Sequence, residues 1–172
     1  MGGEFGPLRV FRPNRDLRFG RDKSPYKLWA GATSESRAVG GIGYYLEVSA
    51  IRLITGYGAM AMTGDQLGRF RAAIDDETGG RAFADLRRDL AARDLPLSPG
   101  IDPPLKTAPR GYAADHPRIE LLRWKGAALV REWEPADWMH TPRVLTTVRE
   151  TWLAAAPLKA WLDAHVGPAG ER

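Results

Sequence analysis

The chain has 172 residues, of which 44% are hydrophobic and 27% are charged, and it contains no cysteine. This length fits one domain that needs neither a disulfide nor a metal to fold, and the lack of cysteine excludes thiolate nucleophiles, cysteine-ligated zinc and redox pairs. The net charge of +4 arises in residues 9–27, which hold seven basic and two acidic residues and leave 18 basic and 19 acidic residues elsewhere.

The charge and hydropathy also indicate where the protein works. The pI near 9.6 favours phosphate or nucleic acid as a partner. No apolar run approaches the about 20 residues of a membrane span, and no signal segment opens the chain. The sequence therefore predicts a cytoplasmic protein without a membrane partner.

The N-terminal half reads as a series of strands. Residues 1–7 carry three glycines and a proline and are expected to be flexible. Residues 8–11 are typical of an edge strand that ends before Pro13, and residues 26–32 can return as a second strand after a turn at 22–25. Aromatic and β-branched content predicts further strands over 44–49 and 52–57.

Helices dominate the rest of the chain. Thr63 or Asp65 can cap a helix to about residue 74, the glycines at 79–80 are expected to end it, and a second helix is expected to end before Pro96. Residues 96–117 form a long proline-rich loop, followed by a short helix to residue 122, a strand over 128–133 and a helical segment over 143–165 interrupted near residue 157. Strands followed by helices predict a single α+β domain over residues 1–172, with a mostly antiparallel sheet from the N-terminal half and helices from the middle and C-terminal parts.

Four separated motifs resemble a known family. These are RVFRPNRDLRFGRDKSPYK at 9–27, GGIGYYLEVS at 40–49, LKTAPRGYAADHPRIELLRWK at 105–125 and PLKAWL at 157–162. In this order they resemble the Domain of Unknown Function 2461 family, which implies a shared fold but supplies no reaction, cofactor or catalytic residue. Family members usually begin earlier, with a helical segment that includes a Trp-Phe pair; if Met1 is not the true start, a hydrophobic face is expected to be uncovered.

The basic segment is the first candidate site. Arginine binds phosphate or carboxylate through two parallel hydrogen bonds, and two carboxylates cannot neutralise seven cations. If residues 110–116 fold against this segment, they would add further cations. The predicted ligand-binding residues are Arg12, Arg15, Asp16, Arg18, Asp22, Lys23, Tyr26, Lys27, Arg110, Asp115 and His116. The alternative is that Asp16 and Asp22 pair with neighbouring arginines and the remaining cations are solvated.

Other motifs point to structure rather than chemistry. His116 is the only candidate acid or base, but Asp115 and His116 before Pro117 also resemble a helix cap, which is the favoured interpretation. The glycines at 40–43 precede a strand, whereas a nucleotide-binding loop follows one, so turn glycines are expected. The three histidines lack metal-ligand spacing, so no metal site is predicted. The C-terminal tryptophans are expected to fill a core.

Two functions follow from this segment, and the sequence leaves open whether the protein is an enzyme and which cofactor it would use. The first is a basic site for a phosphorylated or carboxylated small molecule. The second, not favoured, is a nucleic-acid-associated or protein-interaction module that uses the same basic surface. A third interpretation makes the Asp/Arg motif purely architectural.

Overall fold

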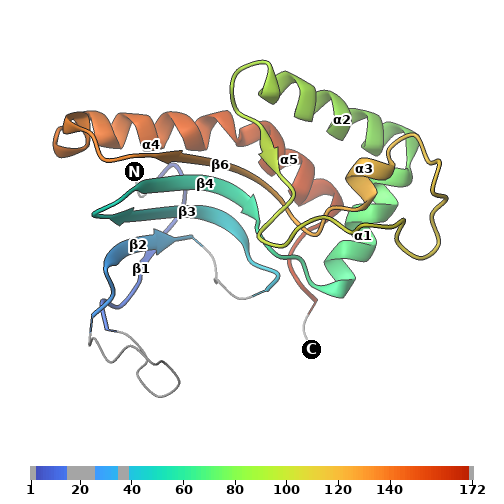
Figure 1. Cartoon of the computed structure of the whole chain (residues 1–172), viewed down its shortest axis with the longest axis horizontal. Coiled ribbons are helices and arrows are strands. Elements are labelled where there is room, and N and C mark those ends of the chain that lie inside the picture. The colour runs from blue at the N-terminus through green and yellow to red at the C-terminus, as the bar shows by residue number, and fades with distance from the viewer. Residues whose placement is uncertain (1–2, 15–25, 35–38, 171–172) are drawn as a thin grey trace.

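One antiparallel sheet organises the molecule, in the strand order β1-β2-β3-β4-β6-β5 (Figure 1). The computed structural model describes residues 3–14, 26–34 and 39–170. Within these residues the predicted α+β class is confirmed. The strands are β1 (Arg9–Val10), β2 (Trp29–Thr33), β3 (Ile42–Ser49), β4 (Leu53–Ala59), β5 (Leu97–Ser98) and β6 (Ala127–Trp133).

The strand register decides which side chains share a face. Tyr44 pairs with Tyr57 and is buried with it, whereas Tyr45 pairs with Gly56 on the other face. β6 returns beside β4, because Ala59 pairs with Ala127. Residues 60–126, which carry α1 (Gly64–Asp75), α2 (Glu77–Ala91), β5 and α3 (Ile119–Leu122), therefore leave and re-enter the sheet at neighbouring positions.

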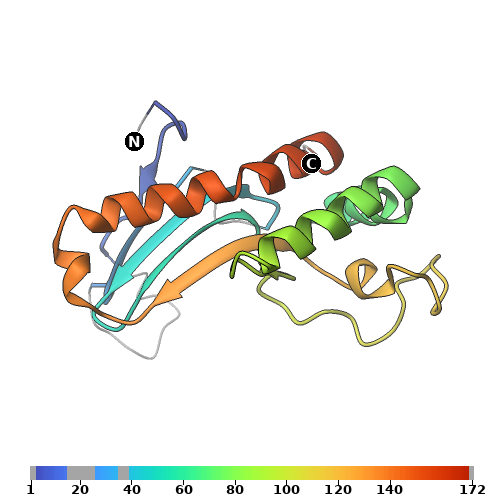
Figure 2. The same cartoon turned by 90° about the horizontal axis from the view of Figure 1, so that it is seen from above.

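Two helices cover the first face of the sheet. α4 (Arg143–Ala154) lies along this face and α5 (Ala156–His165) continues it, with the predicted interruption at Ala155 (Figure 2). A short 3-10 helix, η1 (Asp137–His140), precedes them. Trp152 is 1% exposed, and its indole Nε1 donates a hydrogen bond of 2.8 Å to Thr55 Oγ1 on β4. This bond fixes α4 on the central strand.

The bounds of α1 follow the prediction, but the residues expected to break the helix are different ones. Thr63 forms a capping box with Gln66, so each side chain bonds the other residue's backbone. The sequence prediction that Gly79 and Gly80 end this helix is wrong, because the break lies at Asp76 and both glycines belong to the first turn of α2. Asp76 is the N-cap of α2, and its side chain accepts the Gly79 N–H at 2.8 Å.

The core joins the first face of the sheet to the helices. Phe70, Phe83, Trp124 and Trp161 form an aromatic cluster with ring centroids 4.5–5.9 Å apart. Trp124, Trp152 and Trp161 are each at most 6% exposed, which confirms the core interpretation for these three. Among the described residues, no helix is long and apolar enough to cross a bilayer.

Candidate ligand-binding hollow on the second face of the sheet

A hollow of about 500 Å³ lies on the second face of the sheet. Its lining comes from β3, β4, β6 and their flanking loops, with one residue of β2 and with Ile101 from the loop after β5, and we call it the sheet hollow. The strand register arranges its side chains in rows across the sheet. One row holds Glu47, Ile54 and Glu132, the next holds Tyr45, Gly56 and Val130, and the third holds Gly43, Gly58 and Ala128.

Glycines form the floor of the sheet hollow. A Cβ atom at Gly56 would lie 2.1 Å from the Leu129 carbonyl oxygen, and one at Gly58, which has φ +144°, would lie 2.4 Å from the Ala127 oxygen. These contacts are too short for any side chain, so both positions require glycine. The turn interpretation fits Gly40, which has φ +97°, whereas Gly43 lies within β3.

One end of the hollow carries a polar network. The Tyr45 hydroxyl donates to Glu47 Oε2, and Arg52 Nη2 donates to Glu47 Oε1 at 3.3 Å. Arg52 Nη1 lies 3.6 Å from Glu132 Oε1. The exposed fraction of the side chain rises from 10% for Glu47 to 41% for Arg52 and 54% for Glu132. Glu47 is therefore a nearly buried carboxylate that holds a half-exposed guanidinium at the hollow.

Most of the donors of Arg52 remain available. A guanidinium has five N–H donors, and within the described part of the chain the Arg52 side chain makes only the hydrogen bond to Glu47. The contact to Glu132 is an ion pair beyond hydrogen-bond length. Arg52 can thus present a planar fork to a carboxylate or phosphate oxygen pair while Glu47 keeps its position.

Sequence reasoning did not find Glu47, Arg52 or Glu132. Glu47 carried one usable signal, because a period of two places it on the same face as Tyr45 within a strongly predicted strand. Glu132 is 85 positions away from Glu47 and joins it only through the pairing of β4 with β6.

The described end residues of the basic segment lie at the β1–β2 margin of the sheet. Lys27 Nζ donates to the Arg12 carbonyl oxygen at 2.9 Å and lies 4.8 Å from the ring centroid of Trp29. Arg12 is exposed, and Tyr26 is 62% exposed. The other predicted residues of this segment lie outside the described residues; they are Arg15, Asp16, Arg18, Asp22 and Lys23.

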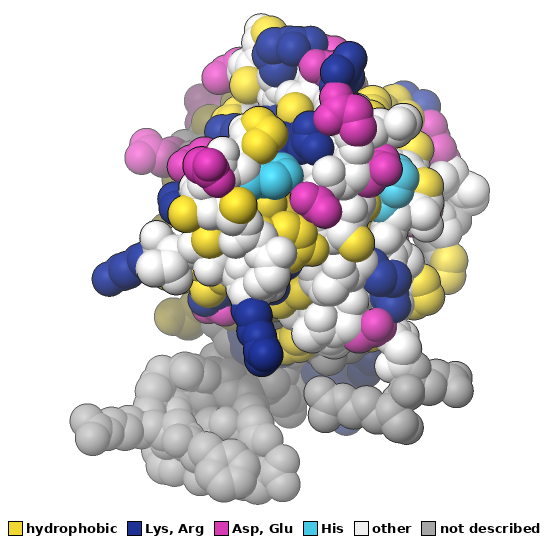
Figure 3. All heavy atoms as spheres, turned by 90° about the vertical axis from the view of Figure 1, so that its right-hand side faces the viewer, with side chains coloured by type: hydrophobic (Ala, Val, Ile, Leu, Met, Phe, Trp, Pro, Cys, Tyr) yellow, Lys and Arg dark blue, Asp and Glu magenta, His cyan; other side chains and the backbone are white. Residues whose placement is uncertain are grey.

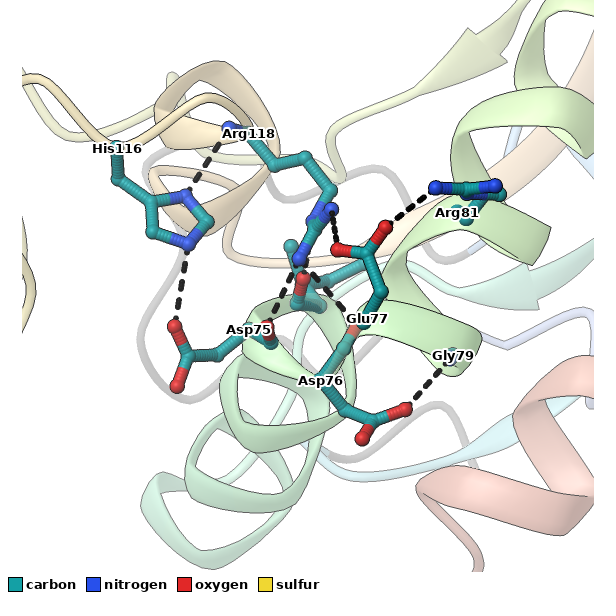
Figure 4. A network of polar contacts seen from close by, with 8 residues as sticks. Asp75, Asp76, Glu77, Gly79, Arg81, His116 and Arg118 are labelled. Carbon is teal, nitrogen blue, oxygen red and sulfur yellow. Dashed lines mark hydrogen bonds and ion pairs between the residues drawn. The ribbon is translucent and has the colours of Figure 1, made fainter.

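His116 lies near the corner between α1 and α2 (Figure 4). His116 Nδ1 accepts the Arg118 backbone N–H at 3.0 Å, and its Nε2 lies 3.1 Å from Asp75 Oδ1. Both ring nitrogens therefore have protein partners. The sequence predicted a helix cap by Asp115 or His116, but the N-cap of α3 is Arg118, and no side-chain cap bond forms there. His116 instead accepts one backbone N–H, that of Arg118. Arg110 and Asp115 are exposed.

Arg118 ties this corner together. Its side chain is 15% exposed, and its guanidinium donates to the carbonyl oxygens of Ile74 at 2.7 Å and Asp75 at 2.8 Å. Its Nη1 also contacts Glu77 at 3.3 Å. Hydrogen bonds from Arg81 and Arg118 hold the pKa of Glu77 below its ordinary value. The arrangement satisfies the end of α1 and has an architectural purpose.

The structure does not bring the described candidates together. Arg12, Tyr26 and Lys27 belong to the β1–β2 margin. The segment that precedes α3, which contains Arg110, Asp115 and His116, lies toward the other end of the long axis (Figures 1 and 2). Figure 3 shows the latter end, where the described basic, acidic and hydrophobic side chains are interspersed. In the described ranges, no three metal-ligating side chains gather into a site.

Comparison with known proteins gives one match. Residues 7–161 match the family described as "Conserved hypothetical protein (DUF2461)". No curated protein and no solved structure matches the chain. The match covers most of the chain and confirms the resemblance drawn from its motifs. The chain therefore belongs to the DUF2461 family of conserved hypothetical proteins.

Proposed function

We propose that the protein binds a small organic molecule with an acidic group in the sheet hollow, and that Arg52 receives this group. The main support is the Arg52 guanidinium, which is half-exposed, is held by the nearly buried Glu47 carboxylate and has unused N–H donors. It lines a hollow of about 500 Å³. Ligand pockets for small molecules typically measure about 300–1,000 Å³ and combine apolar walls with few fixed polar groups. The sheet hollow has both properties.

Glu132 is compatible with an acidic guest because its hold on Arg52 is weak. Its side chain is 54% exposed and its oxygen lies 3.6 Å from Arg52 Nη1. Exposed ion pairs contribute about 0–1 kcal/mol, whereas hydrogen bonds to charged groups contribute about 1.5–3 kcal/mol. A ligand carboxylate that makes two such bonds can replace Glu132 at Arg52, and Glu47 remains the anchor.

The cations of the β1–β2 margin add to the attraction. Within the described part of the chain, Arg9, Arg12 and Lys27 form no ion pair with a carboxylate. Unpaired surface cations raise the local concentration of anions and speed their association, in a salt-dependent way. They support the phosphorylated or carboxylated ligand class that the basic segment suggested, although Arg52 is the proposed contact.

Ring-matched probes test the proposal by titration calorimetry. Benzoate and phenyl phosphate supply the acidic group, benzyl alcohol is the neutral control and benzylamine the cationic one. We expect at least one acid to bind at least about tenfold more tightly than benzyl alcohol, in line with one or more charge-assisted bonds. Failure of both acids to bind at about 10 mM, or tighter binding of benzylamine, would refute the proposal.

Two tryptophan variants locate the binding. Val130→Trp fills the middle row of the sheet hollow, whereas Leu145→Trp adds the same ring to α4, where Leu145 is 58% exposed. We expect the first variant to abolish binding of the acids and the second to leave it unchanged. Filter binding of labelled DNA and RNA at two salt concentrations tests the nucleic-acid alternative, because phosphate neutralisation makes affinity fall steeply with salt. Salt-sensitive nucleic-acid binding without acid binding would favour that alternative.

A further inference from the structure

The lining of the sheet hollow changes from polar to apolar along the strands. The polar end contains Glu47, Arg52 and Glu132, at the row of Ile54. The far end contains Met60, Ala61 and Ile101. Six residues separate Ile54 from Met60, which corresponds to about 20 Å at the strand rise of about 3.4 Å per residue. The glycine floor lies between the two ends.

The apolar end is built by defined backbone contacts rather than by a loose loop. The Ile101 N–H donates to the Met60 carbonyl oxygen at 2.8 Å. Gly100 has φ +110°, and a Cβ atom there would lie 2.6 Å from the same oxygen, so glycine is needed for this approach. Met60 is 40% and Ile101 is 73% exposed. Two large apolar side chains are thus held at the mouth of the hollow, where a ligand can cover them.

We infer that the ligand is an elongated amphipathic acid, with its acidic group at Arg52 and an unbranched or narrow apolar body that follows the glycine floor to Met60 and Ile101. This inference rests on the proposed function and names the class of acid. The narrow body follows from the floor, because glycines let a chain or flat ring approach the backbone closely. The charged side chains of the lining, Glu47, Arg52 and Glu132, lie at one end only, so a ligand that is polar along its whole length would leave hydrogen-bonding groups unsatisfied beside the glycine floor and the apolar end.

A chain-length series tests this class. Calorimetric titration with butanoate, octanoate, dodecanoate and hexadecanoate, the last of which can span the about 20 Å between the two ends, is expected to show affinity rising about three- to fourfold per methylene, the value for one buried CH₂. Glucose 6-phosphate, an acid with a polar body, is expected to bind more weakly than octanoate. An affinity that does not rise with length, or tighter binding of glucose 6-phosphate, would overturn the inference.

A matched pair of variants tests where the apolar body of the ligand lies. Ile101 and Ile51 are both 73% exposed, but Ile51 is next to Arg52 at the polar end. Ile101→Ser is expected to remove the gain between dodecanoate and hexadecanoate without changing butanoate affinity. Ile51→Ser is expected to leave the dependence of affinity on chain length unchanged. An unchanged slope in Ile101→Ser would refute the placement.

Failure of the inference can be told apart from failure of the proposed function. If short acids bind and Val130→Trp abolishes their binding while length has no effect, the acid site stands and the amphipathic class is wrong. If neither benzoate nor phenyl phosphate binds, or if binding of the longer acids persists in Val130→Trp, the proposed function itself fails.

Discussion

Arg118→Ala should destabilise the fold more than any other single loss of charge at the α1–α2 corner. Arg118 donates to the carbonyl oxygens of Ile74 and Asp75, which are among the last residues of α1 and lack helical partners. The Arg118 side chain is 15% exposed, so solvent replaces the lost bonds poorly. The alanine would leave these carbonyls without their donors and would also release α3 from α1.

The expected magnitude follows from these two bonds. Hydrogen bonds to charged groups contribute about 1.5–3 kcal/mol each, and the lower value suits carbonyls at a helix end that water can partly reach. Two bonds give about 3 kcal/mol. For a domain of this size each kcal/mol shifts Tm by about 2–4 °C, so we expect Tm to fall by about 6–12 °C.

Arg81→Ala is the matched control, because Arg81 also pairs with Glu77 but is 71% exposed. An exposed i,i+4 pair contributes about 0.3–0.5 kcal/mol, so its Tm should fall by less than about 2 °C. Differential scanning calorimetry measures both. Equal shifts in the two variants, or a fall below about 2 °C in Arg118→Ala, would show that the carbonyl contacts are not what stabilises this corner.

Three further predictions concern stability. Thr55→Val removes the acceptor of the buried Trp152 indole N–H and the donor to the Tyr45 carbonyl oxygen, and it should cost about 1–3 kcal/mol in urea unfolding. Thr151→Val loses a bond to Thr147 within α4 and should cost less than about 1 kcal/mol, so equal costs would contradict this expectation. Gly68→Ala should stabilise α1 by about 0.5–1 kcal/mol, because the new Cβ atom would meet open space. Gly80→Ala should destabilise the fold, because its Cβ atom would lie 2.1 Å from the Ile74 carbonyl oxygen. Stabilisation by both variants would refute the close contact at Gly80. Arg81 and Arg118 lower the pKa of Glu77, so the ionised Glu77 side chain stabilises the fold above its unfolded pKa of about 4.3, and this stabilisation is lost as pH falls through the lower folded pKa. The difference in unfolding free energy between Glu77→Gln and the parent should therefore vanish in acid. A difference that grows in acid would contradict the lowered pKa.

Local signals predicted most of the fold. The strand over 44–49, the cap at Thr63 and the interruption near residue 157 each depend on neighbours in sequence, and each appears in the structure. The glycines at 79–80 led to a wrong helix end because their role is to allow a close tertiary contact, which a local signal does not reveal. A Cβ atom at Gly80 would lie 2.4 Å from Arg118 Nε, so the position serves a contact with a residue 38 positions away rather than a helix break.

The candidate site was harder to predict because it depends on register. Charge density along the chain pointed to residues 9–27, whereas the polar network of the sheet hollow joins Glu47 to Glu132 across β4. Glu47 and Glu132 come together only because β6 pairs with β4 although residues 60–126 lie between the two strands in the sequence. No periodicity or spacing in a single sequence contains this information. His116, selected for its chemistry, proved to bond the backbone of Arg118 and to contact Asp75.

Because Ala59 pairs with Ala127, residues 60–126 form a detour between neighbouring positions of β4 and β6, and within this detour β5 pairs with β6. Lengthening a loop costs little once its ends are fixed, about 0.6 kcal/mol for each doubling. Glu47, Arg52 and Glu132 lie outside this detour, whereas Met60 and Ile101 lie within it. In the proposed site, changes within residues 60–126 would therefore alter the apolar end at Met60 and Ile101 and leave Arg52 and its carboxylate partners in place.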